Sequence, residues 1–197
     1  MLQLQKMEQL KALIFNKYVL WIFLAIPMTL MIGGIITGKA EYDGIMHATG
    51  EFSTRFLVFT LIATPLGMML PKTRFPRWLL RNRRYFGVAA FAYALLHTIY
   101  YLYEIAFDQV MSEVLQLEII TGWIAFLIFV PLAITSNDYS IRVMKKAWKK
   151  LQRWVYLAAL MVIFHWGFLH GHWGGVAFHF VPVAVLQLYR VWKLQQK

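Results

Sequence analysis

Long apolar stretches alternate with short polar ones along almost the whole chain. Six of these stretches are long enough, or nearly so, to cross the roughly 30 Å hydrocarbon core of a membrane as helices. They cover residues 18–38, 54–71, 85–105, 119–137, 154–171 and 175–192. The pattern therefore predicts an all-α polytopic membrane protein built as a bundle of six transmembrane helices.

The segments outside these stretches predict a simple domain organisation. Residues 1–17 mix apolar and polar positions at helical spacing and are expected to form an amphipathic interfacial helix in front of the bundle. The first apolar stretch is too long for the apolar region of a cleavable signal peptide. The link 170–175 is tight, so the last two spans are expected to be antiparallel neighbours. We expect a leader at 1–17 and one membrane domain at 18–197.

Composition supports the membrane class and limits the chemistry. The 197 residues are 60% hydrophobic and only 15% charged, which is too apolar for a soluble domain of this length. Cysteine is absent from the sequence. Disulfides, thiolate-held iron–sulfur clusters and covalent haem attachment through C-x-x-C-H are thereby excluded.

Basic residues gather on one predicted side of the membrane. Eighteen of the 20 Lys and Arg residues fall in the N-terminal and C-terminal segments and in the loops before the third and fifth spans, whereas Lys39 and Arg55 do not. Seven of the nine acidic residues fall on the other side. The positive-inside rule then predicts that both termini are cytoplasmic. The net charge of +11 is interpreted as topology and contact with anionic membrane lipid, not as nucleic-acid binding.

His97 and His165 are ionisable residues inside the third and fifth apolar stretches. Each lies roughly 17–18 Å from the start of its predicted span at 1.5 Å per residue, so the two are expected at the same depth. Ionisable residues within a span indicate function by default, and two imidazoles at one depth are typical of axial ligands of a haem iron. Without cysteine such a haem is non-covalent and b-type. The alternative is a pair of neutral histidines that hydrogen-bond across the bundle.

Four further histidines and one arginine are candidates for supporting roles. His47 precedes the second predicted span, and His170, His172 and His179 gather near the outer end of the last two spans. These three suit zinc or copper, but no carboxylate accompanies them at helical spacing, so interfacial histidines are the alternative. Arg55, in the first turn of the second span, is a candidate for neutralising haem propionates; pairing with Glu51 is the alternative.

The sequence contains no recognisable substrate-converting site. We find no nucleophile–base pair, carboxylate dyad, phosphate-binding glycine loop or dinucleotide fingerprint. No residue is therefore predicted to be catalytic, and the chain is expected to carry electrons.

Several segments, in their order and spacing, resemble the ferric-reductase-like transmembrane family. They are His47-Ala-Thr-Gly50, Ile62-Ala-Thr-Pro-Leu66, Arg81-Asn-Arg-Arg-Tyr-Phe-Gly87, Leu95-Leu-His97, Leu132-Ala-Ile-Thr-Ser136 and Trp148-Lys-Lys-Leu-Gln-Arg-Trp-Val-Tyr-Leu157, which leads to His165. Within that family the likeness is greatest to haem-binding membrane subunits of periplasmic methionine-sulfoxide reductase systems. The likeness covers about residues 45–168.

The resemblance implies a function in the bacterial inner membrane. His97 and His165 match the positions of the family's haem ligands. Such a subunit passes electrons to a periplasmic molybdenum-containing reductase, and its donors are the quinone pool or a flavin, with FMN a possible cofactor and a flavin reductase a possible source. Arg84 and its basic neighbours are expected to meet the flavin or quinol headgroup.

The chain departs from the family pattern at one level. Relatives with two stacked haems carry a second histidine pair on the cytoplasmic side, where this chain has Arg84 and Gln152, each 13 residues before a candidate ligand. One haem b is therefore expected. The departure leaves open an accessory or scaffold subunit of a larger membrane redox complex, with one haem or none. A self-contained metal or oxygen reductase is disfavoured because the chain has no flavin and nucleotide domain.

Overall fold

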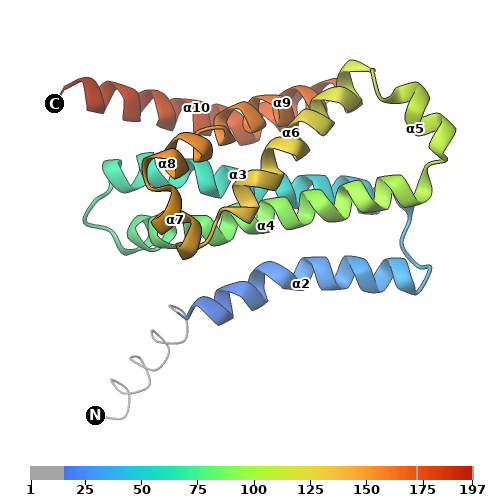
Figure 1. Cartoon of the computed structure of the whole chain (residues 1–197), viewed down its shortest axis with the longest axis horizontal. Coiled ribbons are helices and arrows are strands. Elements are labelled where there is room, and N and C mark those ends of the chain that lie inside the picture. The colour runs from blue at the N-terminus through green and yellow to red at the C-terminus, as the bar shows by residue number, and fades with distance from the viewer. Residues whose placement is uncertain (1–15, 172, 197) are drawn as a thin grey trace, which may run out of the picture. The chain divides into compact units, whose positions relative to one another are not determined.

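The computed structural model describes residues 16–171 and 173–196, and within them it contains helices and no strand (Figure 1). The predicted leader at 1–17 lies almost wholly outside the described residues. The helices are α2 (Lys17–Ile36), α3 (Tyr42–Met69), α4 (Arg74–Glu104), α5 (Phe107–Glu113), α6 (Leu117–Ile134), α7 (Asp138–Met144), α8 (Lys146–Gln152), α9 (Val155–His170) and α10 (Trp173–Gln195).

Five of the described helices are long and apolar enough to cross a membrane: α2, α3, α4, α6 and α10. The chain is accordingly an all-helical, multi-pass membrane protein. Helix α9 falls on the predicted span 154–171, but its 16 residues reach only about 24 Å at a rise of 1.5 Å per residue. The six-span count and the cytoplasmic position of both termini stay predictions.

Helix α3 begins well before the apolar stretch 54–71 that predicted it. It starts at Tyr42, so His47 lies on the helix. The prediction that His47 precedes the helix is wrong. Arg55 is in the middle of α3 and not in its first turn. The apolar stretch marks where lipid-facing residues begin, whereas the helix continues wherever backbone hydrogen bonds can form, and polar side chains do not prevent this.

Helix α4 likewise begins at Arg74, ahead of the predicted stretch 85–105. The arginines of this region, from Arg74 to Arg84, are therefore helical, whereas Lys72 lies in the turn before the helix. The predicted loops after α4 and α6 also contain short helices: α5 follows α4, and α7 and α8 follow α6. Between α7 and α8, Lys145 takes a φ of 48°, which breaks the helix.

The chain divides into two compact units, residues 1–45 and 46–197. In the described part of the first unit, the Asn16 side chain caps α2 by accepting a hydrogen bond from the Tyr18 backbone amide at 2.9 Å. Such a cap satisfies one of the backbone donors left over at a helix start.

The second unit contains the buried core. Helices α3 and α4 pack through aromatic rings, with Phe52 and Phe56 lying 5.4 and 5.3 Å from Tyr93 between ring centroids. The Ser53 hydroxyl donates to the Ala90 carbonyl at 2.9 Å and joins the same two helices. Because a bilayer offers no water for such groups, this polar contact is satisfied within the bundle.

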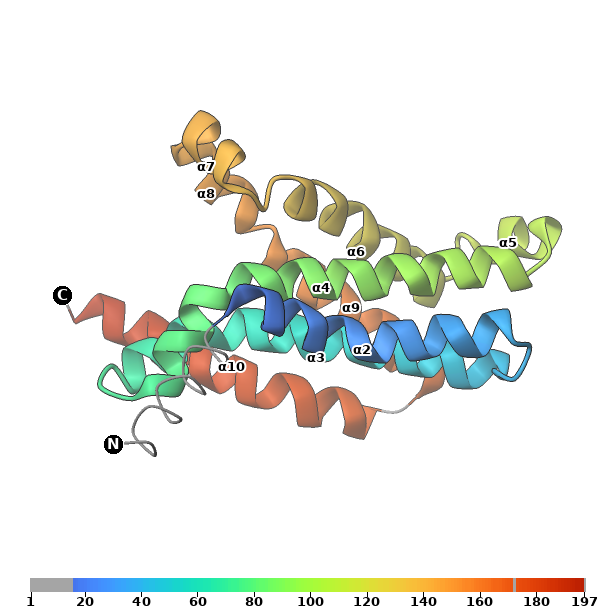
Figure 2. The same cartoon turned by 90° about the horizontal axis from the view of Figure 1, so that it is seen from below.

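Helices α6 and α9 form the most extensive helix pair, and α10 packs against α9 (Figures 1 and 2). Small buried residues, Ala125 on α6 and Ala158 and Ala159 on α9, let the helix backbones approach closely. The expected contact between the last two spans is confirmed. The chain turns at Gly171, whose φ of 61° suits glycine.

Candidate functional site

His97 on α4 and His165 on α9 lie next to each other in the second unit. Their ring centroids are 6.3 Å apart and their planes cross at 89°. Both side chains are half-buried. The sequence predicted that the two histidines lie at the same depth in the bundle. In the structure they are neighbours, although they are 68 positions apart in the chain.

Helix α3 orients the His97 ring. The Nδ1 atom of His97 lies 3.1 Å from the Met46 carbonyl oxygen and 3.0 Å from the Thr49 hydroxyl oxygen. A carbonyl only accepts, so Nδ1–H donates to Met46, and Nε2 is the ring nitrogen with a lone pair for a metal. The early start of α3 makes this possible, because both partners lie before residue 54.

Helix α6 orients the His165 ring in the same way. Nδ1 of His165 lies 2.6 Å from the Glu118 carbonyl oxygen. One turn later stands Gly122, where an added Cβ would lie 2.8 Å from Nδ1 of His165. At Gly50, beside His97, an added Cβ would lie 3.5 Å from Cε1 of that ring. Each histidine therefore has a backbone carbonyl on Nδ1 and a glycine against its ring.

Among the described residues, these two rings are a histidine pair whose Nε2 atoms could bind a metal. A hydrogen bond from the non-ligating nitrogen to a carbonyl is the usual arrangement around a metal-bound imidazole, since it fixes the tautomer and raises ligand basicity. Within residues 16–171 and 173–196, no group of three or more His, Asp or Glu side chains could hold a metal ion. A haem iron needs only two axial protein ligands.

The other candidate histidines do not assemble into a metal site within the described part of the chain. His47 is exposed, with Nε2 3.9 Å from a carboxylate oxygen of Glu51. His179 donates through Nδ1 to the Gly175 carbonyl at 2.9 Å and packs against Trp166. His172 and the side chain of His170 lie outside the described residues.

Arg55 pairs with Glu51, the alternative recognised from sequence. Its Nη2 lies 2.5 Å from Oε1 of Glu51, one turn earlier on α3. The guanidinium also lies over the ring of Phe52, 5.3 Å from its centroid. Contact between Arg55 and a haem propionate stays a prediction.

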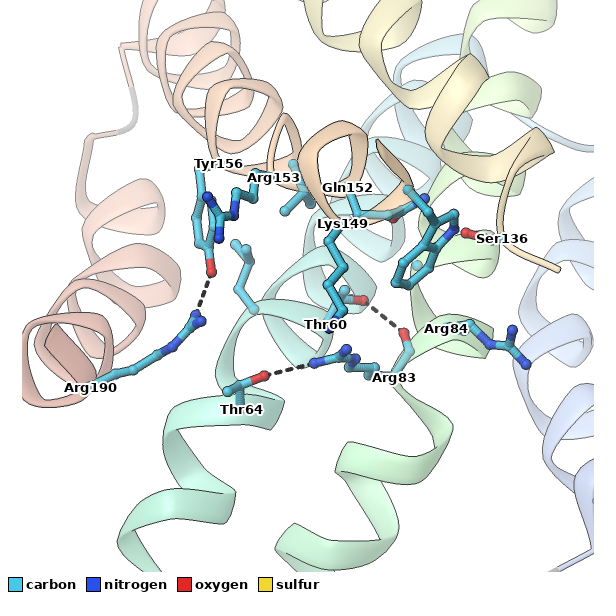
Figure 3. Close-up of a pocket in the computed structure, with 14 residues that line it drawn as sticks. Thr60, Thr64, Arg83, Arg84, Ser136, Lys149, Gln152, Arg153, Tyr156 and Arg190 are labelled. Atoms are coloured by element: carbon cyan, nitrogen blue, oxygen red, sulfur yellow. Dashed lines mark hydrogen bonds between the residues drawn. The ribbon is translucent and has the colours of Figure 1, made fainter. Parts of the chain in front are cut away.

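A second feature lies at the end of the bundle where basic residues gather. A cavity of about 260 Å³ is lined there by α3, α4, α8, α9 and α10 and includes both Arg84 and Gln152 (Figure 3). Arg84 forms an ion pair with Asp138 at 2.7 Å. The Gln152 amide donates to the Leu132 carbonyl at 3.0 Å and to the Thr135 hydroxyl at 3.2 Å. Arg84 and Gln152, which stand where relatives with two haems carry a second histidine pair, are thus both engaged in contacts within the protein.

Sequence reasoning identified the two histidines but not the groups that orient them. The carbonyls of Met46 and Glu118 belong to the backbone, so no residue type marks them. Gly122 was a detectable signal, because a glycine inside an apolar span indicates a close approach of another group. Thr49 belongs to the segment 47–50 that resembles the family, and the sequence assigned no role to its hydroxyl.

Comparison with known proteins identifies the family of the chain. Residues 49–163 match the family described as ferric reductase like transmembrane component. A relative from Caulobacter vibrioides, named protein-methionine-sulfoxide reductase heme-binding subunit MsrQ, is 36% identical over 163 residues, which are 79% of this chain and 75% of the relative.

Two other relatives carry the same name. The one from Xanthomonas euvesicatoria is 34% identical over 82% of this chain and 74% of its own length, and the one from Brucella ovis is 36% identical over 62% and 56%. No solved structure matches. The family match spans the stretch that contains Thr49, His97 and Gly122. The chain belongs to the ferric reductase-like transmembrane family, in which it is similar to the MsrQ subunits.

Proposed function

We propose that this chain is a membrane electron-transfer subunit that binds one haem b through His97 and His165. It accepts electrons from a quinol or flavin donor and passes them to a periplasmic reductase of the methionine-sulfoxide repair type. The relatives' names, heme-binding subunits of protein-methionine-sulfoxide reductase, support the cofactor and the reductase system. The proposal includes six spans in a bacterial inner membrane with both termini in the cytoplasm.

The proximity of the two histidines is the observation that carries the proposal. Their ring centroids lie 6.3 Å apart on two different helices. His97 and His165 would hold the haem iron, each through one ring nitrogen. The backbone carbonyls of Met46 and Glu118 accept from the two Nδ1 atoms, which supports Nε2 of each ring as the atom that would bind the metal.

The chemistry supplied by a bound haem is reversible one-electron storage at the iron. The protein residues contribute position and environment. The two carbonyls hold the rings in one tautomer and orientation, and the glycines at 50 and 122 leave room for the rings. A bilayer around these apolar helices would keep water from the pair, which would favour the less charged state of a redox centre placed there.

Acceptance of electrons is proposed at the basic end of the bundle. Arg84 lies there with its charge compensated by Asp138. A compensated guanidinium suits a neutral quinol headgroup better than a flavin phosphate, so we favour the quinone pool as donor over FMN. Arg55, already paired with Glu51, remains our candidate contact for a haem propionate.

The proposal is tested by the visible spectrum of the purified protein. We expect a low-spin b-type spectrum in the reduced state that His97→Ala and His165→Ala each abolish or convert to high spin. His179→Ala is the matched control, because that imidazole is held by Gly175 of its own helix and should leave the spectrum unchanged. Unaltered spectra in both ligand variants would falsify the assignment.

A scaffold subunit without electron transfer is the second candidate function. Gln152 favours it, because its amide is committed to α6 at the level where relatives with two haems carry a ligand. A purified protein free of haem that co-purifies with a larger redox complex would support the scaffold. A haem that is reduced by quinol and oxidised by a methionine-sulfoxide reductase would support electron transfer.

A further inference from the structure

Four cationic side chains line one side of the cavity at the basic end of the bundle. They come from α4, from α8 and the turn after it, and from α10, and we call them the four-cation cluster: Arg83, Lys149, Arg153 and Arg190. Figure 3 shows them arranged around the same space; Arg84 also lines the cavity but is paired with Asp138. Residues 83 and 190 are far apart in sequence, so the fold brings this charge together.

Within residues 16–171 and 173–196, the ion pairs of the chain include none between the four-cation cluster and a carboxylate. Arg83 donates to the Thr64 hydroxyl at 2.9 Å and Arg190 donates to the Tyr156 hydroxyl at 2.6 Å, which are neutral acceptors. Among the described residues, the carboxylate of Asp138 near this cavity forms an ion pair with Arg84. Arg83 and Arg190 are half-buried, whereas Lys149 and Arg153 are exposed. Like charges gathered around one cavity repel one another, and an anion from outside the chain would relieve the repulsion.

The lining specifies which anion fits. Guanidinium groups bind phosphate oxygens through two parallel hydrogen bonds, and a lysine ammonium adds a point charge. The Tyr156 hydroxyl, which accepts from Arg190, can donate its own hydrogen at the same cavity, and Leu61 and Val155 give the cavity an apolar wall. A volume of about 260 Å³ lies below the roughly 300–1,000 Å³ typical of whole drug-sized ligands. A charged headgroup with an apolar continuation fits better than a complete flavin nucleotide.

We propose that this cavity binds the phosphate headgroup of an anionic phospholipid such as phosphatidylglycerol. Basic pockets between transmembrane helices are known binding places for such headgroups. The lipid's phosphate would meet the four-cation cluster while its acyl chains leave along the apolar wall into the bilayer. The inference requires nothing of the histidine pair and stands independently of haem binding.

The test is calorimetric titration of delipidated full-length protein in maltoside detergent. Dihexanoylphosphatidylglycerol is compared with dihexanoylphosphatidylcholine, inorganic phosphate and FMN. We expect saturable binding of one phosphatidylglycerol per chain, with phosphatidylcholine about tenfold weaker or more. Removing two charges with Lys149→Gln and Arg153→Gln should weaken phosphatidylglycerol binding by about 25-fold, at about fivefold per charge.

The double variant Lys146→Gln with Lys150→Gln is the matched control. It removes the same charge from exposed positions of α8 that do not line the cavity, and its affinity should stay within about twofold of the unmodified protein. Should the cavity variant fail to fold, Arg153→Gln is compared with Arg153→Lys, which keeps the charge and should retain most of the binding.

Four results would overturn the proposal. Equal affinity for the two lipids would show that the net negative charge of the phosphatidylglycerol headgroup is not recognised. Equal losses of affinity in the cavity and control variants would show unspecific electrostatic attraction. Tighter binding of inorganic phosphate or FMN, with the same dependence on the cluster, would assign the site to a soluble phosphate. If every variant keeps its haem spectrum but the lipid titration shows no saturable binding, the inference is wrong and the proposed function is unaffected.

Discussion

At the scale of single residues, the two glycines beside the histidine rings make a matched pair. Both stand in helices against an imidazole, yet the space differs: an added Cβ meets His165 Nδ1 at 2.8 Å at position 122 and His97 Cε1 at 3.5 Å at position 50. The first distance requires the ring to move, whereas the second is ordinary van der Waals contact. The ring of His165 has little freedom to move, because Glu118 holds its Nδ1.

We therefore expect opposite results from the same substitution. Gly122→Ala should displace His165, lower the haem content and cost about 1–3 kcal/mol of stability through overpacking. Gly50→Ala should be neutral or stabilise by up to about 1 kcal/mol, since alanine is the better helix former. Haem-to-protein ratio and thermal unfolding in detergent measure both effects. Equal behaviour of the two variants would mean that the glycines do not shape the ligand pair.

Single residues also mark what could be foreseen from sequence. His97 and His165 were identifiable because an ionisable side chain in an apolar span is rare and conspicuous. Their orientation was not, because it depends on the carbonyls of Met46 and Glu118, which every residue type possesses. Arg84 was marked as a donor contact by its position, but its pairing with Asp138 depends on where the segment after α6 folds back.

At the scale of helices, the end of α6 explains why α8 lies where it does. The last carbonyls of a helix have no partner within the helix, and in a bilayer each must be satisfied by protein. The Leu132 carbonyl accepts from Ser136 and Gln152, and the Thr135 carbonyl accepts from the Trp148 indole at 2.9 Å. Helix α8 thus supplies donors to the C-terminal end of α6.

Removing the Gln152 amide should loosen this connection. Gln152→Ala takes away hydrogen bonds to the Leu132 carbonyl and the Thr135 hydroxyl and should lower stability by about 1–2 kcal/mol. Lys150→Ala, an exposed position of the same helix, is the control and should change stability by less than about 0.5 kcal/mol. Thermal unfolding of the two variants gives the comparison, and equal melting temperatures would show that the bonds contribute nothing.

The helices also show the limits of hydropathy as a predictor. It located the apolar part of each long helix, because lipid selects apolar side chains there. It missed the polar first turns of α3 and α4, where backbone hydrogen bonding continues without lipid contact. It also missed α5, α7 and α8, because a helix of seven residues lies at an interface and has no apolar stretch of its own.

At the scale of the whole molecule, haem stoichiometry follows from which levels of the bundle carry ligands. The first level has the histidine pair His97 and His165. The second level, 13 residues earlier on each chain segment, has Arg84 in an ion pair and Gln152 hydrogen-bonded to α6. We expect a pyridine haemochrome ratio close to one haem per chain. Gln152→His alone should leave that ratio unchanged, because no second ligand faces the new imidazole. A measured ratio near two for the unmodified protein would contradict this and require ligands outside the histidine pair.

The opposite end of the bundle from α8 is the proposed exit for electrons, and there the charge is negative. Helix α5 lies at this end (Figure 1), with Asp108 exposed in its first turn. Glu113 is fixed in place by hydrogen bonds from Gln109 at 2.9 Å and from Tyr101 of α4 at 3.4 Å. Carboxylates held on an ordered helix steer a positively charged partner and raise its association rate, and salt screens this attraction over a Debye length of about 10 Å at 0.1 M.

Electron transfer from pre-reduced protein to its reductase should therefore slow about tenfold between low and high ionic strength. Asp108→Asn with Glu113→Gln should lower the rate at low salt and flatten the salt dependence, because the screened charges are gone. Glu41→Gln with Asp43→Asn removes the same charge from the first unit and serves as the control, with little change expected. The stopped-flow rate of haem oxidation measures each case. If the rate changes neither with salt nor with the α5 substitutions, the partner docks away from α5. The carboxylates would then serve membrane topology alone.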